Sequence, residues 1–207
     1  MPSAVPAEGS SRAPIGAVLA GGKSTRMGAP KACVELAGRP LIAHALGKIV
    51  AAGIEPVVVA KPGSELPRID CPVIRDDDSA LHPAAGILAA LRANRGGPVV
   101  ALACDMPFVP PELVAFLAKL DVEMAVPRIG SRLQPLLARY SPTATPALEA
   151  VVEQATPLRE AIGALDPLIL ERKDLSPFGE PERIGFNVNE RGDLAAAERL
   201  MAVAPSR

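Results

Sequence analysis

The sequence has few of the residues that build metal clusters or disulfide scaffolds. Its 207 residues include three cysteines (Cys33, Cys71 and Cys104) and two histidines, and no two cysteines form a C-x-x-C pair. An odd, widely spaced set of cysteines is typical of a reduced intracellular protein. Two histidines argue against a zinc site made only of protein ligands. We therefore expect a cytoplasmic protein without a disulfide framework.

Long apolar runs and a strong net charge are also missing. Although 49% of the residues are apolar, no run approaches the roughly 18 residues of a membrane span. The formal net charge is −1, so no overall field attracts nucleic acid or an anionic membrane, and neither is expected as a partner. Residues 1–13 lack the basic and apolar regions of a signal peptide, so we expect a disordered tail and then one domain over residues 14–207.

The most informative segment is residues 15–31, with the sequence IGAVLAGGKSTRMGAPK. An apolar run ends in Gly21 and Gly22, and the polar stretch that follows contains the cations Arg26 and Lys31. A strand that leads into a glycine-rich cationic loop is a common phosphate site in α/β proteins. Glycine lets backbone N–H groups approach the oxygens, and the cations neutralise their charge. A surface turn with basic residues is the alternative interpretation.

Two familiar phosphate loops do not fit the spacing. The P-loop requires G-x-x-x-x-G-K-[ST], and residues 22–24 match its end, but Ala17 stands where the first glycine is needed. The dinucleotide fingerprint G-x-G-x-x-G is absent from the segment, which argues against a dehydrogenase. What remains is L-A-G-G-x-S-x-R-M-G-x-x-K, from Leu19 to Lys31.

Apolar, strand-like runs alternate with helical patterns over the first 120 residues. This alternation predicts an α/β fold with a mostly parallel sheet covered by helices on both faces, and ligands then bind at the carboxyl ends of the strands. Strands are expected over residues 15–20, 56–60, 72–75, 98–104, 122–127 and 133–140, the last two flanking a turn at Gly130. Helices are expected over residues 41–52, 84–94, 111–120, 147–154, 158–165 and 194–203, and residues 170–185, rich in proline and charge, are expected to form a loop.

Two aspartates follow predicted strands. Asp105 ends a strand too apolar to hold an interior charge, so its carboxylate is expected at the sheet edge beside the glycine loop, where it suits Mg²⁺. Capping of the helix after Pro110 is the alternative. Asp76 is the first of three consecutive aspartates after the strand at 72–75, and we expect it to point into the same cleft while the other two are solvated.

Three further segments offer groups to this edge. The helix that opens at Pro83 has small residues up to Gly86, which leave room for a base or ribose, whereas the preceding His82 is interpreted as a loop residue. Asn187 and Asn189 lie on one face of an extended segment and can hold a metal or substrate oxygen, unless Asn189 caps the last helix. A strand-like run begins with residues suited to the phosphate of an acceptor, Arg132, Gln134 and Pro135.

Taken together, LAGGKSTRMGAPK, the P-x-x-G at residues 83–86, CDMPF and the NVN segment resemble molybdenum cofactor guanylyltransferase, a family of nucleotidyltransferases. The motifs occur in that order and cover the chain from about residue 15 to 200. The resemblance implies a Rossmann-like, doubly wound sheet. It also implies a reaction that joins the GMP moiety of Mg-GTP to the terminal phosphate of the molybdenum cofactor (molybdopterin) and releases pyrophosphate.

The resemblance also implies roles for individual residues. The charge on the leaving group would be offset by Arg26 and Lys31, and Mg²⁺, the implied cofactor, would bind Asp105. Binding of the acceptor is expected from residue type and position, rather than from the resemblance, for Arg132, Gln134, Asn187 and Asn189. Nucleotide binding is implied for Leu19, Ala20, Gly21, Gly22, Lys31, Asp76, Pro83, Gly86 and Asp105.

One position departs from the family pattern. The family often carries an asparagine at the end of the strand 57–59, and this chain has Ala60, so contacts to guanine must be made otherwise. The paired glycines favour GTP, because cytidylyl-transferring relatives tend to read L-A-A-G. The alternatives are transfer from CTP, transfer to a sugar phosphate or cobinamide phosphate, and a non-catalytic nucleotide-binding chaperone for cofactor insertion. Transient contacts with cofactor-synthesis proteins or apo-molybdoenzymes are also expected.

Overall fold

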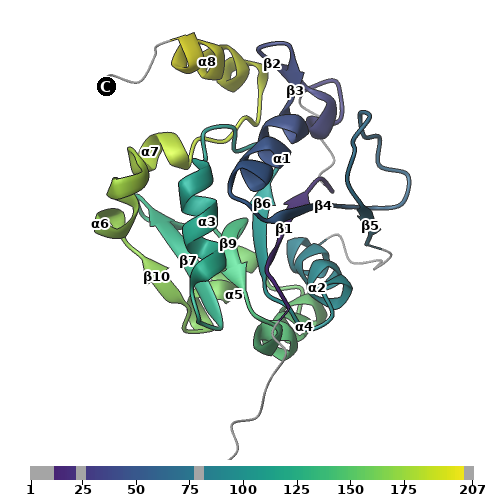
Figure 1. Ribbon diagram of the computed structural model, residues 1–207, viewed down its shortest axis with the longest axis vertical. Helices are drawn as coiled ribbons and strands as arrows, with labels where there is room; N and C mark the ends of the chain where they lie inside the picture. The colour runs from purple at the N-terminus through teal and green to yellow at the C-terminus, as the bar shows by residue number, and fades with distance from the viewer. Residues whose placement is uncertain (1–11, 22–26, 77–81, 203–207) are drawn as a thin grey trace, which may run out of the picture.

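A computed structural model describes residues 12–21, 27–76 and 82–202. In these residues an eight-stranded sheet has the order β10-β7-β9-β6-β1-β4-β5, with β8 paired to β7 (Figure 1). The strands are β1 (Ile15–Leu19), β4 (Glu55–Ala60), β5 (Val73–Arg75), β6 (Val99–Ala103), β7 (Met124–Ile129), β8 (Arg132–Leu133), β9 (Leu137–Tyr140) and β10 (Leu168–Leu170). A separate two-stranded hairpin joins β2 (Glu35–Leu36) to β3 (Arg39–Pro40).

The strands β4, β1 and β6 form the parallel centre of the sheet. Leu19 of β1 lies level with Val59 on one side and Ala103 on the other, and β5 continues the parallel arrangement beside β4. Parallel pairing therefore brings the carboxyl ends of these four strands to one edge. The strand β9 runs antiparallel to both β6 and β7, and β10 returns parallel to β7.

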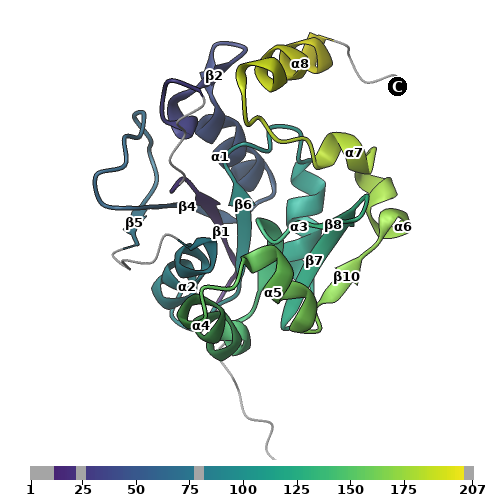
Figure 2. The ribbon, with the colours of Figure 1, turned by 180° about the vertical axis from the view of Figure 1, so that it is seen from behind.

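Helices cover both faces of the sheet, as the sequence predicts for a doubly wound α/β fold (Figure 2). One face carries α1 (Leu41–Ala51), α3 (Pro111–Lys119), α6 (Arg172–Leu175) and α7 (Pro181–Ile184). The other carries α2 (Pro83–Ala93), α4 (Thr145–Glu153) and α5 (Leu158–Ala164), and α8 (Arg191–Ala202) packs beside the β2-β3 hairpin. None of the helices in the described ranges is long and apolar enough to cross a membrane.

Most predicted elements are confirmed to within a few residues, and two predictions are wrong. The strand expected over residues 133–140 is divided into β8 and β9, because the intervening Pro135 has no N–H to donate to a ladder. The loop expected over residues 170–185 contains α6 and α7. A reciprocal capping box between Glu171 and Asp174 starts α6, and Pro181 occupies the first turn of α7, where its missing N–H costs little.

The expected tail lies mostly outside the described residues, which begin at Arg12. Asn94 anchors the start of the described chain, because its Nδ2 donates to the carbonyl oxygens of Ala13 at 3.2 Å and Pro98 at 2.9 Å. The division into a tail and one domain stays a prediction.

A glycine inside β1 sets how closely α1 packs on the sheet. A Cβ atom at Gly16 would lie 2.3 Å from Cγ2 of Ile49, a fully buried residue of α1. Any side chain at this position therefore displaces the helix that covers the strand leading to the glycine loop.

We expect Gly16→Ala to lower the free energy of unfolding by about 1–3 kcal/mol, because the new methyl group overlaps the Ile49 side chain. Denaturant titration measures this loss. The matched background is Ile49→Ala, which itself costs about 2–5 kcal/mol but removes the overlapping atoms. In that background Gly16→Ala should cost much less, and an equal loss in both backgrounds would contradict the packing argument.

Candidate functional site

The residues that follow the four parallel strands gather at one edge of the sheet. After β1 the backbone stays paired for one more residue, because the Ala20 N–H donates to the Val59 carbonyl oxygen at 2.9 Å. After β5 the Asp76 N–H donates to the Ala60 carbonyl oxygen at 3.0 Å. These bonds hold Gly21 and Asp76 close to the sheet edge.

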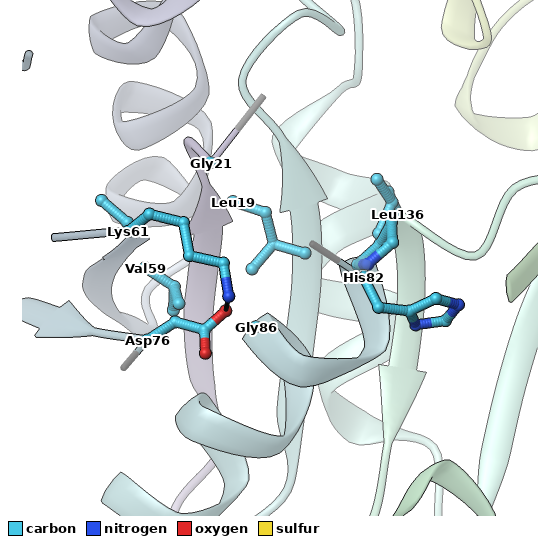
Figure 3. Close-up of a pocket in the computed structure, with 10 residues that line it drawn as sticks. Leu19, Gly21, Val59, Lys61, Asp76, His82, Gly86 and Leu136 are labelled. Atoms are coloured by element: carbon cyan, nitrogen blue, oxygen red, sulfur yellow. Dashed lines mark ion pairs between the residues drawn. The ribbon is translucent and has the colours of Figure 1, made fainter. Parts of the chain in front are cut away.

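A largely apolar cavity of about 340 Å³, called here the first cavity, opens at this edge (Figure 3). Its walls come from the ends of β1, β4 and β5 and from the first turn of α2. It is lined by Leu19, Gly21, Val59, Ala60, Lys61, Asp76, His82, Pro83, Gly86 and Leu136.

Gly86 keeps the first cavity open on the side of α2. A Cβ atom there would lie 3.4 Å from Leu19 Cδ2, 3.6 Å from Val59 Cγ1 and 4.0 Å from Asp76 Oδ2. The position lies inside a helix, where glycine is less favourable than alanine by roughly 0.5–1 kcal/mol. The small residue therefore provides space in the cavity at a cost to the helix.

An ion pair forms one end of the first cavity. Nζ of Lys61 lies 2.8 Å from Oδ2 of Asp76, and the two side chains are 17% and 6% exposed. Asp76 points into the cleft as the sequence predicts. Lys61 was not predicted, although it directly follows β4 just as Asp76 directly follows β5.

His82 lies at the opposite end of the first cavity and is fixed through both ring nitrogens. Its Nδ1 accepts from the Ala84 N–H at 3.2 Å and caps α2, and its Nε2 lies 2.8 Å from the Thr156 carbonyl oxygen. Because the carbonyl oxygen can only accept, Nε2 carries the hydrogen. His82 thus ties the start of α2 to the segment between α4 and α5, which is a structural role.

Lys31 connects three segments that are far apart in the sequence. It lies in a short 3-10 helix, η1 (Lys31–Cys33), and its Nζ donates to Asp105 Oδ2 at 2.5 Å and to Asn189 Oδ1 at 2.8 Å. The main chain strengthens the same junction, because the Val188 N–H donates to the Asp105 carbonyl oxygen at 2.9 Å. The start of η1, the end of β6 and the NVN segment therefore meet at one cation.

The two capping alternatives are not found. The helix α3 begins after Pro110 without a side-chain cap, so Asp105 does not cap it. At the start of α8, Asp193 Oδ2 accepts from the N–H groups of Asn189 and Glu190. The Asn189 side chain is therefore available to Lys31.

Asp105 has the features of a ligand for a hard cation. Its Oδ1 atom is buried and finds no hydrogen-bond partner within the described chain, an arrangement that is costly for a carboxylate. No group of three or more His, Cys, Asp or Glu side chains surrounds it in those same ranges. A magnesium ion needs one or two carboxylates together with water or phosphate oxygens, so Asp105 fits Mg²⁺ carried by a phosphate ligand.

The neighbouring cysteine is not suited to covalent catalysis. Cys104 is buried, and burial, with a smaller effect from Asp105, raises the pKa of its thiol to about 12. The nucleophilic thiolate is therefore scarce at neutral pH.

A wider second cavity of about 820 Å³ adjoins the first. His82, Pro83 and Leu136 line both, and the second also has Arg132 and Arg159 in its walls, so it offers positive charge beside Asp105. It is lined by His82, Pro83, Ala103, Asp105, Met106, Ile129, Arg132, Gln134, Pro135, Leu136, Pro157, Leu158, Arg159, Gly185, Asn187 and Asn189.

The predicted site residues fall into three groups. In the first cavity lie Leu19, Gly21, Asp76, Pro83 and Gly86. In the second lie Asp105, Arg132, Gln134, Asn187 and Asn189, with Lys31 bound to two of them. Ala20 supports the strand end rather than lining either cavity, and Gly22 and Arg26 lie outside the described residues.

The sequence does not predict Arg159 of α5 as a site residue, because it lies far along the chain in an ordinary helical pattern. No local signal connects it with the strand ends, and only the folded chain brings α5 to the second cavity.

Comparison with known proteins agrees with this arrangement. The sequence matches the family described as MobA-like NTP transferase domain over residues 16–168. It is 32% identical over 193 residues to a protein of Pelotomaculum thermopropionicum named "Probable molybdenum cofactor guanylyltransferase", covering 90% of this chain and 92% of the relative. It is 35% identical over 180 residues to molybdenum cofactor guanylyltransferase of Pseudomonas putida, covering 81% and 93%.

A solved structure shares the fold. Molybdopterin-guanine dinucleotide biosynthesis protein A from Archaeoglobus fulgidus superposes with a TM-score of 0.78 at 30% identity, covering 91% of this chain and 99% of that one. The family match spans well over half of the chain, and the curated relatives are covered almost completely. The chain therefore belongs to the MobA-like NTP transferase family.

Proposed function

We propose that this protein is a molybdenum cofactor guanylyltransferase. It transfers the GMP moiety of GTP to the terminal phosphate of the molybdenum cofactor and releases pyrophosphate. The observation that carries the proposal is the junction of Lys31 with Asp105 and Asn189, two residues that line the second of two adjoining cavities. The names of the relatives support the same reaction.

Each cavity suits one substrate. The first cavity is apolar with one charged end, which suits a base, and it begins at Gly21, so the triphosphate would follow the glycine loop toward Lys31. The second cavity is larger, and Arg132 and Arg159 supply charge for an anionic acceptor. Gln134, Asn187 and Asn189 add amide groups that can bind its polar atoms without adding charge.

The reaction needs positioning and charge neutralisation rather than a protein nucleophile. The phosphate of the acceptor attacks the α-phosphorus of GTP in line, the bond to the β-phosphate oxygen breaks, and pyrophosphate leaves with its electron pair. Lys31, held by Asp105 and Asn189, places a positive charge beside the reacting phosphates. Arg26, by its place in the sequence, would add a second cation on the leaving group.

Mg²⁺ is proposed as the cofactor, with Asp105 as its protein ligand because of the buried oxygen described above. When bound, the ion would polarise the phosphate oxygens and neutralise developing charge. Exchange of Lys31 from Asp105 onto phosphate would leave the carboxylate accessible to the ion.

The proposal includes a location and partners. Cys33, Cys71 and Cys104 are all free thiols, which supports a reducing compartment and hence the cytoplasm. The product is a dinucleotide cofactor, so transient contact with cofactor-synthesis proteins or with apo-molybdoenzymes would pass it on.

We expect Asp105→Ala and Lys31→Ala each to lower turnover by several orders of magnitude. The first removes the proposed ligand of Mg²⁺, and the second removes a positive charge that would stabilise the reacting phosphates. Pyrophosphate release from GTP, Mg²⁺ and molybdenum cofactor measures this, and circular dichroism checks folding. The controls are Asp70→Ala and Lys119→Ala, exposed residues away from both cavities that should keep full activity. Near-normal release by either site variant, strong preference for CTP, or release independent of molybdenum cofactor would overturn the proposal.

We expect Gly86→Ala to lower GTP affinity about tenfold while preserving or raising stability, because the methyl group enters the first cavity but favours the helix. Calorimetric titration gives the affinity and thermal unfolding gives the stability. The matched control is Gly47→Ala, an exposed glycine in α1 whose added Cβ would approach nothing closer than 3.8 Å. Unchanged GTP affinity in Gly86→Ala would show that the base lies elsewhere.

A further inference from the structure

We propose that Lys61 selects guanine in the first cavity by donating a hydrogen bond to O6 of the base while its ion pair with Asp76 holds it in place. The inference rests on the proposed function, since it identifies how this same site recognises its nucleotide. It assigns a specificity-determining role to a residue that follows β4.

The ion pair between Lys61 and Asp76 lies in the wall of the first cavity rather than at the solvent-exposed surface. Lys61 extends from the end of β4 to Asp76 at the end of the neighbouring β5, with 2.8 Å between Nζ and Oδ2. Both side chains are largely buried. Figure 3 shows the pair on one side of the cavity, Leu19 across from it, and His82 and Leu136 on the far side.

Within the described residues, the rest of the cavity wall offers few hydrogen-bonding side chains to the polar edge of a base. Lys61 and Asp76 are the charged groups among the described side chains that line the first cavity. Both nitrogens of the His82 ring are hydrogen-bonded to backbone groups. Ala60, the last residue of β4, contributes only a methyl group to the cavity wall. A base in this cavity therefore finds its side-chain hydrogen bonds at the ion pair.

The chemistry of that pair favours guanine over adenine. An ammonium group has only hydrogens to donate, and guanine presents O6 and N7 as adjacent acceptors, whereas adenine presents an amino group at position 6. Lysine contacts to O6 and N7 of guanine are a common means of recognising this base. An adenine in the same place would leave the ammonium facing a donor in an apolar cavity, which is costly.

Asp76 has two connected effects. It neutralises Lys61, so that a lone cation is not buried, and it orients the ammonium toward the cavity. Its carboxylate can also accept from the N1–H and N2 amino groups of guanine, which lie beside O6. The Lys61 ammonium can thus donate to O6 of guanine while the Asp76 carboxylate accepts from its N1–H and N2 amino groups.

The test compares three nucleotides in the presence of Mg²⁺ by calorimetric titration of the full-length chain. GTP and ITP both carry O6, and the triphosphate of 2-aminopurine riboside lacks it. We expect Lys61→Met to weaken GTP and ITP about 10- to 100-fold alike and to leave the 2-aminopurine nucleotide nearly unchanged. Lys119→Met, an exposed lysine at the end of α3, is the matched control and should change none of the three.

Every outcome has a defined meaning. Equal weakening of all three nucleotides, or weakening no greater than in Lys119→Met, would overturn the role of Lys61. If Lys61→Met does not fold because Asp76 loses its cation, Lys61→Gln replaces it. Its shorter amide can still bond to Asp76 but does not reach the base, so GTP and ITP should weaken about tenfold, and unchanged affinities would again overturn the inference. Failure of the wild-type protein to bind GTP would instead contradict the proposed function.

Discussion

The parallel pairing of β1 with both β4 and β6 is the constraint on which the site depends. It places Leu19, Val59 and Ala103 level with one another, so the chain leaves three strands at the same height. Whatever residue follows each strand is then delivered to a common edge. Gly21, Lys61 and Asp105 share this edge because of backbone hydrogen bonds made several residues earlier, and the close packing of α1 over Gly16 keeps that strand arrangement intact.

This constraint also explains how much could be predicted from the sequence. The doubly wound fold and the positions of Asp76 and Asp105 follow from apolar runs and from the residue after each run. The same reasoning applies to Lys61, but a lysine after a strand is usually solvated, and only the ion pair with Asp76, the residue after β5, distinguishes it from a surface lysine. The strand around Pro135 and the loop around Pro181 were predicted wrongly because the effect of a proline depends on its position. A proline interrupts a strand where its N–H would join the ladder, but it is tolerated in the first turn of a helix, where that N–H has no partner.

Other parts of the site could not have been found in this way. The contacts of Lys31 with Asp105 and Asn189, and the presence of Arg159 in the second cavity, depend on packing between segments with no local relation in sequence. The two largely shielded ion pairs, Lys31–Asp105 and Lys61–Asp76, share a principle. In each, a carboxylate holds a lysine in position before substrate arrives, so less conformational entropy is lost on binding and the charge is already directed at its target. A chain of net charge −1 can in this way provide strong local fields.

The contact between Lys31 and Asn189 has a consequence for biosynthesis. These residues are 158 positions apart, and Asn189 lies two residues before the start of α8 at Arg191. Because a domain can complete its long-range contacts only after both segments have left the ribosome, the parallel strands can assemble well before the phosphate-handling centre exists. A nascent chain that has emerged only as far as α7 would thus retain much of the sheet yet lack the contact between Lys31 and Asn189.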